Sequence, residues 1–240
     1  MNEVLATLAP SELATGWVAF SALAGLVVGS FLNVVIHRCQ QSLVTGVAWT
    51  WHRLLPKSGC AHCGAPIRAL DNIPLLSFLC LRGRCRHCQS RISWRYPVVE
   101  AGSSLLCAVV GAFWGPSWTA LFLWLWVWLL LCLAFIDLKT RYLPDALTLP
   151  TLWLGLLCNS TGALIAPADA IWGAALGYVS LWLIHHIFLQ ITGKDGMGYG
   201  DFKLMAAIGA WLGWTVLPLV LTLAAVSGAT VGLVLSLIHI

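Results

Sequence analysis

Charged side chains are scarce in this sequence. Asp, Glu, Lys and Arg make up only 9% of its 240 residues, whereas soluble globular domains carry about 25%. Hydrophobic residues make up 60% instead. This composition excludes a soluble globular enzyme, a disordered tail and a fibrous repeat.

The sequence also lacks a basic segment before its first apolar stretch. That stretch runs without a charge from Thr15 to Ile36, and the residues before it carry Glu3 and Glu12. A cleaved signal peptide has a positively charged start and a shorter apolar core. We therefore expect residues 15–36 to remain in the protein as a membrane-spanning helix.

Further apolar stretches fill most of the chain. They cover residues 97–114, 117–136, 146–165, 170–191 and 204–240. The last is too long for one crossing of a bilayer core, which takes about 20 residues, so we expect a break near Gly213 or Pro218. The predicted fold class is all-α, a polytopic transmembrane helical bundle of about seven spans.

The positive charges fall on one side of these spans. With the N-terminus outside, the segments that face the cytoplasm are 37–96, 137–145 and 192–203. These three segments contain all 13 Lys and Arg residues. Because Lys and Arg near a span resist translocation, we expect this orientation. The basic residues either serve the topology alone or also attract anionic lipid or substrate.

Two C-x2-C pairs lie in the large segment 37–96. They consist of Cys60, Cys63, Cys85 and Cys88. Such pairs offer four thiolates to one tetrahedral zinc ion. Disulfides are disfavoured in a reducing compartment, and four thiolates leave no open position for catalysis, so we expect a structural zinc site. His62 and His87, inside the pairs, are alternative ligands.

Two aspartates stand at the cytoplasmic ends of apolar stretches. Asp137 follows the stretch 117–136, and Asp201 ends the motif Gly198-Tyr199-Gly200-Asp201. An ionisable group at a membrane boundary is costly unless it is paired or faces a polar cavity. Both residues are therefore candidates for function.

A pair of carboxylates suits acid and base catalysis. Two close carboxylates cannot both ionise, so one can activate water while the other donates a proton, as in an aspartic protease. Such a pair titrates as a unit, which leaves the two roles unassigned. Lys139 and Lys203, two residues after each aspartate, tune this titration or anchor the helices. The alternative is that both aspartates only cap helices or mark the interface.

Three other carboxylates have structural interpretations. We expect Asp145 and Asp169 to be helix N-caps, because each stands just before an apolar stretch. We expect Glu100 to pair with a loop arginine or with Lys139. A third catalytic group at Glu100 is the alternative.

Together these motifs resemble the type IV prepilin peptidases, also called bifunctional leader peptidase and N-methyltransferase. The resemblance covers nearly the whole chain. Besides the cysteine pairs, it rests on GSFLNVVIHR (29–38), LRGRC (81–85), RYPVVE (95–100), DLKTRYLPD (137–145) and GYGDFK (198–203).

The resemblance implies an aspartic endopeptidase of the bacterial inner membrane, with Asp137 and Asp201 as its catalytic pair. Its substrates would be type IV prepilins and type II secretion pseudopilins, cut at the cytoplasmic face after the glycine that ends a short basic leader. The new N-terminal residue, usually phenylalanine, would then be methylated with S-adenosylmethionine as donor, an activity that the resemblance associates with Gly83. Membrane lipid is a further expected partner, and nucleic acid is not.

The expected domain organisation has three parts. Residues 1–36 form the N-terminal segment and first helix, 37–96 the cytoplasmic zinc loop, and 97–240 the transmembrane peptidase domain. Family members continue with a Pro-Phe-Gly-Pro-type motif and a closing helix, so we expect the C-terminus here to be truncated.

Two alternative functions stay open. The first is a peptidase without methylation, because the sequence contains no glycine-rich nucleotide-binding turn. The second is a non-catalytic scaffold or a transporter in which Asp137 and Asp201 carry protons. Transport sites usually lie near the bilayer midplane, whereas these carboxylates lie at its edge, which favours the peptidase.

Overall fold

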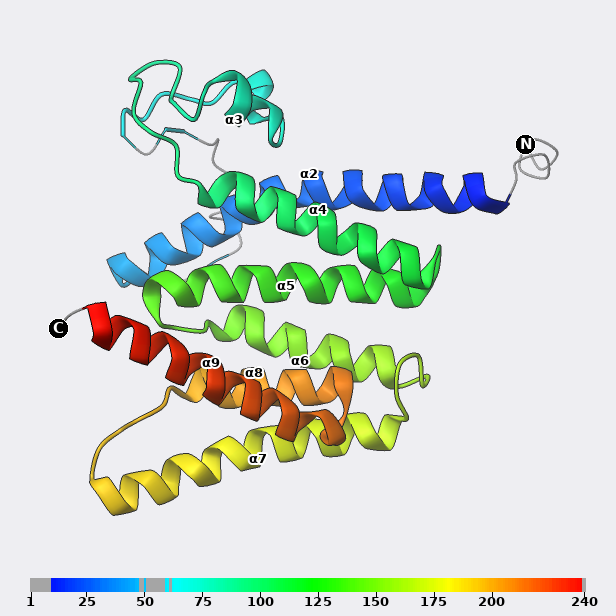
Figure 1. Ribbon diagram of the computed structural model, residues 1–240, viewed down its shortest axis with the longest axis vertical. Coiled ribbons are helices and arrows are strands. Elements are labelled where there is room, and N and C mark those ends of the chain that lie inside the picture. The colour runs from blue at the N-terminus through cyan, green and yellow to red at the C-terminus, as the bar shows by residue number, and fades with distance from the viewer. Residues whose placement is uncertain (1–9, 48–49, 51–58, 61, 239–240) are drawn as a thin grey trace. The chain divides into compact units, whose positions relative to one another are not determined.

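The computed structural model describes residues 10–47, 50, 59–60 and 62–238 (Figure 1). These residues form helices and short turns. The only β-structure in this part of the chain consists of two isolated bridges, Gly59 with Pro66 and Arg84 with Arg91. The predicted all-α fold is confirmed. The chain divides into two compact units, Met1–Leu143 and Pro144–Ile240.

The first unit contains three long helices and the cysteine loop. The helices are α2 (Pro10–Thr45), α4 (Arg95–Trp114) and α5 (Trp118–Thr140), and each packs against the other two (Figure 1). The loop between α2 and α4 carries the short helices η2 (Ala69–Asn72) and α3 (Leu76–Cys80).

Helix α2 continues beyond the predicted end of the first span at Ile36. No proline or glycine interrupts the sequence from Ser30 to Thr45, so nothing stops the helix at the predicted boundary. It ends before Gly46, whose φ of +68° suits glycine. His37, Arg38 and Gln40 therefore project from a helix instead of a loop.

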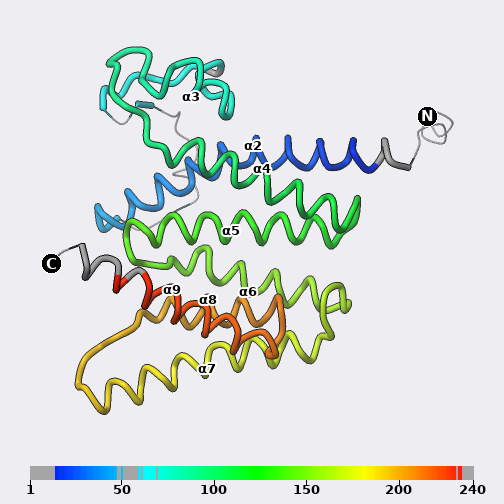
Figure 2. Tube along the Cα trace, viewed as in Figure 1, coloured from blue at the N-terminus to red at the C-terminus, as the bar shows by residue number. Residues whose placement is uncertain are grey.

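The second unit is held by close packing of α6 (Asp145–Asn159), α7 (Pro167–Thr192) and α8 (Tyr199–Leu212), which lie side by side (Figure 2). Where α7 crosses α8, Gly173 faces Gly209. A Cβ atom on Gly209 would lie 2.0 Å from the carbonyl oxygen of Gly173. The two backbones are thus in direct contact, as small residues permit between membrane helices.

A buried asparagine joins the ends of α6 and α8. Asn159 is fully buried, and its Nδ2 donates to the carbonyls of Ala210 and Trp211 at 2.9 and 3.3 Å. Its Oδ1 accepts from the N–H groups of Leu164 and Ile165. Helix α6 ends at this residue, before the predicted end of the stretch at residue 165.

The last apolar stretch breaks as predicted near Gly213. Gly213 ends α8 with a φ of +84°, and η3 (Trp214–Val216) and α9 (Leu217–Ile238) follow. With α9 the described chain contains seven α-helices of 14 residues or more.

Four described helices are long and apolar enough to cross a membrane. They are Ala14–Thr45, Arg95–Trp114, Trp118–Thr140 and Pro167–Thr192, and the stretch Trp214–Thr230 is apolar but shorter. Helices α6 and α8, with 15 and 14 residues, fall short of the roughly 20 that a bilayer core needs. The prediction of a polytopic membrane protein is confirmed by these helices.

The predicted N-caps at Asp145 and Asp169 are wrong. The N-cap residues are Pro144 and Ala166, and each aspartate lies in the first helical turn. Their carboxylates accept hydrogen bonds from other side chains, Asp145 from Lys203 Nζ at 2.6 Å and Asp169 from Trp214 Nε1 at 3.1 Å.

Candidate functional site

The four cysteine sulfurs converge in the loop of the first unit. The Sγ atoms of Cys60, Cys63, Cys85 and Cys88 all lie within 4.8 Å of one another. The Sγ atoms of Cys60 and Cys88 are 3.8 Å apart. Ligands about 2.3 Å from a tetrahedral zinc ion would be separated by about 3.8 Å, so the cluster could hold zinc.

Two similar turns bring these sulfurs together. The N–H of Gly64 donates to the Cys60 carbonyl at 2.9 Å, and the N–H of Gln89 donates to the Cys85 carbonyl at 3.0 Å. Each turn is closed by one of the isolated bridges. The spacing of each pair therefore builds its own turn, and the fold only has to place two turns face to face.

The electrostatics of the cluster favour a bound cation. Backbone N–H groups of Cys63 and His62 lower the pKa of the Cys60 thiol to about 6. The Ser90 hydroxyl and N–H lower the pKa of Cys88. The Ala65 N–H favours the Cys63 thiolate, but desolvation and the neighbouring Cys88 and Cys60 sulfurs outweigh it and raise the pKa of Cys63 to about 11. A divalent cation would remove this competition between thiolates.

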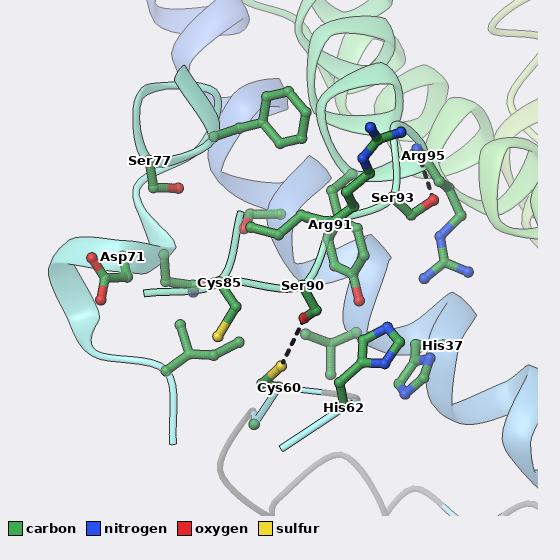
Figure 3. A pocket seen from close by; sticks show the side chains of 18 of the residues that line it. His37, Cys60, His62, Asp71, Ser77, Cys85, Ser90, Arg91, Ser93 and Arg95 are labelled. Carbon is green, nitrogen blue, oxygen red and sulfur yellow. Dashed lines mark hydrogen bonds between the residues drawn. The ribbon is translucent and has the colours of Figure 1, made fainter. Parts of the chain in front are cut away.

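A cavity of about 1150 Å³ lies next to the cluster, within the first unit. Cys60 and Cys85 form part of its wall, and His62 and His87 line it without joining the sulfur cluster. Figure 3 shows that the loop supplies Cys60, Asp71 and Ser90, while His37 comes from α2 and Arg95 from α4.

Cationic side chains from three helix ends line this cavity. They are Arg38 from α2, Arg95 from α4 and Lys139 from α5, and the imidazole of His37 from α2 also lines the cavity. Gln40 ties these helices together, because its Oε1 accepts from Arg95 Nη1 at 2.8 Å and its Nε2 donates to the Phe135 carbonyl at 2.7 Å. The Nε–H of Arg95 is buried and has no acceptor among the described residues. No motif predicted a role for Gln40, whose only signal in the sequence is a polar residue near an apolar stretch.

Glu100 is 7% exposed, and within the described part of the chain it pairs with neither Lys139 nor a loop arginine. Its Oε2 accepts the backbone N–H of Leu75 at 2.8 Å. Leu75 has a positive φ of +58°, which turns its N–H toward α4. The carboxylate at the cavity wall thus fixes the loop to the helix.

Asp71, the other carboxylate of the cavity wall, pairs with a cation. Arg86 Nη2 lies 2.6 Å from Asp71 Oδ1, and this hydrogen-bonded pair lowers the pKa of the Asp71 carboxyl. The ion pair joins η2 to the second cysteine turn, since Arg86 follows Cys85 directly.

Gly83 lies beside the cavity wall and not in it. Its φ is +66°, and a Cβ atom there would lie 3.1 Å from the Phe78 ring. Phe78 lines the large cavity and packs on Trp94, with ring centroids 5.0 Å apart. Gly83 lines a separate, smaller cavity, whose wall also includes Phe78 and Trp94. A side chain at position 83 would therefore press on Phe78.

Asp137 is exposed in the last turn of α5, on a different face from the cavity. Phe135, Leu138 and Lys139 line the cavity, and Asp137 does not. With 3.6 residues per turn, these three residues share one side of the helix and Asp137 projects from the other. Lys139 thus faces the cavity rather than Asp137.

Asp201 lies in the second unit, half-buried in the first turn of α8. Gly198 is the N-cap of this helix, and Phe202 is fully buried against the rings of His185, Tyr199 and Tyr178. This aromatic packing fixes the start of the helix. Lys203 pairs with Asp145 at 2.6 Å. Asp137 and Asp201 belong to different units.

Comparisons with known proteins cover both units. Residues 23–114 match the family model of the bacterial peptidase A24 N-terminal domain, and residues 124–233 match that of the type IV leader peptidase family. No solved structure matches the chain.

Several curated proteins are similar to this chain over most of their length, and each is called prepilin leader peptidase/N-methyltransferase. The protein from Pseudomonas putida is 48% identical over 91% of this chain and 81% of its own. The protein from Aeromonas hydrophila is 48% identical over 95% of this chain and 86% of its own length. The protein from Burkholderia pseudomallei strain 1026b is 45% identical over 93% of this chain and 78% of its own length.

Proposed function

The chain belongs to the type IV leader peptidase family, and we propose from this that it removes the short basic leader of type IV prepilins and type II secretion pseudopilins. We propose that it then methylates the new N-terminal residue. Both activities stand in the printed name of relatives about half identical to this chain, and this identity carries the proposal.

Asp137 and Asp201 are the proposed catalytic pair of the peptidase. One carboxylate takes a proton from water, whose oxygen attacks the carbonyl carbon of the leader glycine. The other, protonated carboxyl donates to the departing amine as the C–N bond breaks. The proposal is supported by their position at ends of apolar helices, Asp137 exposed and Asp201 half-buried.

The proposed orientation puts the N-terminus outside the bacterial inner membrane and the cysteine loop and both aspartates in the cytoplasm. It is supported by Arg38, Arg95 and Lys139, which stand at the helix ends nearest the loop, because such residues resist translocation. A leader is cytoplasmic and the segment after it is apolar, so the bond to be cut would lie at this boundary of the membrane.

Zinc is the proposed metal of the cysteine cluster, in a structural role. Cys60, Cys63, Cys85 and Cys88 would occupy all four positions of a tetrahedral ion, which leaves none for water or substrate. The loop buries few side chains, so metal binding would supply much of its folding free energy.

S-adenosylmethionine is the proposed methyl donor, and when bound it supplies an electrophilic methyl group. The cleaved peptide supplies the nucleophile, the free amine of its first residue. This amine exists only after cleavage, so the two reactions follow one another on one substrate.

Prepilin cleavage by the purified protein in liposomes tests the peptidase. Wild type, Asp137→Asn and Asp201→Asn are compared, and the N-terminus of the product is read by mass spectrometry. We expect cleavage after the leader glycine to fall at least about 10²–10⁴-fold in both variants. Asp195→Asn is the matched control, because Asp195 is an exposed carboxylate in the loop before α8. Cleavage that survives both substitutions would exclude the aspartate pair.

The same spectra separate the alternatives. A product without an added methyl group would indicate a peptidase alone. A transporter or scaffold would give no cleavage in any of the four proteins.

A further inference from the structure

We propose that the cavity of the first unit binds S-adenosylmethionine, with the adenine on the aromatic side formed by Trp94 and Phe78 and the methionine carboxylate on the cationic side formed by Arg95 and its neighbours. This assignment rests on the proposed N-methyltransferase activity and gives it a location.

The cavity is large enough for donor and acceptor together. Pockets for small ligands usually measure about 300–1,000 Å³, and this one measures about 1150 Å³. Its apolar wall comes from the ends of the three long helices, at Val34, Val98, Phe135 and Leu138. This wall suits the apolar first residue of a cleaved prepilin, while the donor occupies the space nearer the loop.

The aromatic side carries an exposed tryptophan. Trp94 is 73% exposed although it lines the cavity and lies on Phe78. An exposed indole at a cavity wall is a ready surface for a flat ligand, because base and aromatic ring stack through their π-faces. Tyr96, another aromatic residue of the wall, lies under the guanidinium of Arg95 at 5.1 Å.

The two carboxylates of the wall have partners other than the guanidinium of Arg95. Asp71 is paired with Arg86, and Glu100 is held by the Leu75 N–H. Arg95 keeps a buried Nε–H without an acceptor among the described residues. A carboxylate is the group that satisfies a guanidinium through paired hydrogen bonds. The amino-acid end of the donor supplies that carboxylate.

The cavity is separate from the proposed peptidase carboxylate of the same unit. Helix α5 presents Phe135, Leu138 and Lys139 to the cavity and Asp137 to its other face. A donor in the cavity therefore does not occupy the place of a leader peptide at Asp137. Substitutions in the cavity wall should change methylation and leave cleavage intact.

Methylation kinetics on a ready-made acceptor test this assignment independently of cleavage. The protein is reconstituted in nanodiscs with zinc and given a synthetic peptide that begins with the phenylalanine of a mature pilin. For Trp94→Ala we expect the KM for S-adenosylmethionine to rise about 5- to 100-fold, as for loss of one stacking partner. The kcat at saturating donor should change little. Trp94→Phe should restore most of the KM.

Trp118→Ala is the matched control, because Trp118 is 80% exposed in the same unit and does not line the cavity. Its KM should equal that of wild type. Calorimetry with S-adenosylhomocysteine, which cannot react, should show the same weakening for Trp94→Ala alone. Cleavage of full-length prepilin and zinc content report on folding and should stay at wild-type values in all three variants.

Three results would overturn the assignment. An unchanged KM and an unchanged affinity for S-adenosylhomocysteine in Trp94→Ala would remove the site and leave the proposed function standing. Equal losses of cleavage and methylation in Trp94→Ala and Trp118→Ala would make Trp94 a membrane-interface anchor. Displacement of S-adenosylhomocysteine by phosphatidylglycerol, with no effect of Trp94→Ala, would assign the cavity to a lipid headgroup. A wild type that cleaves prepilin but never methylates the peptide would instead refute the methyltransferase half of the proposed function.

Discussion

The two units use their interiors in opposite ways. The first contains an open cavity of about 1150 Å³ with apolar and cationic walls, whereas the second brings the backbones of α7 and α8 into contact at Gly173 and Gly209. Room for a small ligand therefore lies in the first unit. The second unit offers rigid support for one carboxylate at the start of α8.

The two units also differ in what holds them together. The loop of the first unit depends on specific polar contacts, such as those of Glu100 and Asp71, and on its cysteine cluster. The second unit is held by apolar packing and by the buried side chains of Asn159 and Trp211. Substitutions in the first unit should therefore affect methylation more than cleavage, and substitutions in the second unit should affect cleavage more than methylation.

Loss of one cysteine of the cluster should have the largest effect on methylation relative to cleavage. We expect Cys85→Ser to lose the proposed zinc and to lower methylation at least about 100-fold, because the metal would supply much of the folding free energy of the loop that walls the cavity. Cleavage should be largely retained. Metal analysis and the two activity assays measure this. Cys80→Ser is the control, since Cys80 is exposed in the same loop and outside the cluster, and equal zinc loss in both variants would contradict the account.

A methyl group added at the contact of α7 and α8 should instead lower cleavage and leave methylation intact. Gly209→Ala puts a Cβ atom 2.0 Å from the Gly173 carbonyl oxygen, so we expect the free energy of unfolding to fall by about 1–3 kcal/mol or more and cleavage to fall with it. Methylation of the synthetic peptide should persist. Thermal unfolding in detergent measures the first effect. Gly228→Ala, which has no atom within 4 Å of the added carbon, should unfold like wild type.

A side chain at Gly83 should weaken methylation alone. Gly83→Ala adds strain at a φ of +66° and presses on Phe78 at 3.1 Å, so we expect a raised KM for the methyl donor and normal cleavage. Gly46→Ala separates the two causes, since Gly46 has a φ of +68° and open space around it. If both variants lose methylation equally, backbone strain and not the Phe78 contact is responsible.

Removal of the Lys203 charge should have the smallest effect. Lys203 pairs with Asp145 near the surface, and such pairs contribute less than about 1 kcal/mol. Lys203→Gln should therefore leave the pH profile of prepilin cleavage unchanged. A profile displaced along the pH axis would show that Lys203 acts on the catalytic pair instead.

Features set by local spacing could be predicted from the sequence. Each cysteine pair forms its own turn, and Gly213 interrupts the last apolar stretch by its own φ. The distance between the two turns depends on the path of the whole loop. Only the zinc hypothesis predicted that the two turns lie close together. The positions of Asp137 and Asp201 at helix ends likewise follow from where apolar residues stop.

Features set by tertiary contacts could not be predicted. The partner of Glu100 is a backbone N–H of the loop, which no pattern of charges reveals. Lys139 faces the cavity because α5 packs with that side toward the loop. The two N-cap predictions failed because the helices begin at Asp145 and Pro167, so the aspartates lie inside the first turn.

The most direct test of the central claim is one mass-spectrometric comparison of two variants, each assayed for both reactions. Asp201→Asn should methylate the synthetic pilin peptide and fail to cleave prepilin. Trp94→Ala should cleave prepilin and, at low donor concentration, leave the product largely unmethylated. If instead each variant loses both activities while it keeps its zinc and its fold, cleavage and methylation share one site and the separation proposed here is wrong.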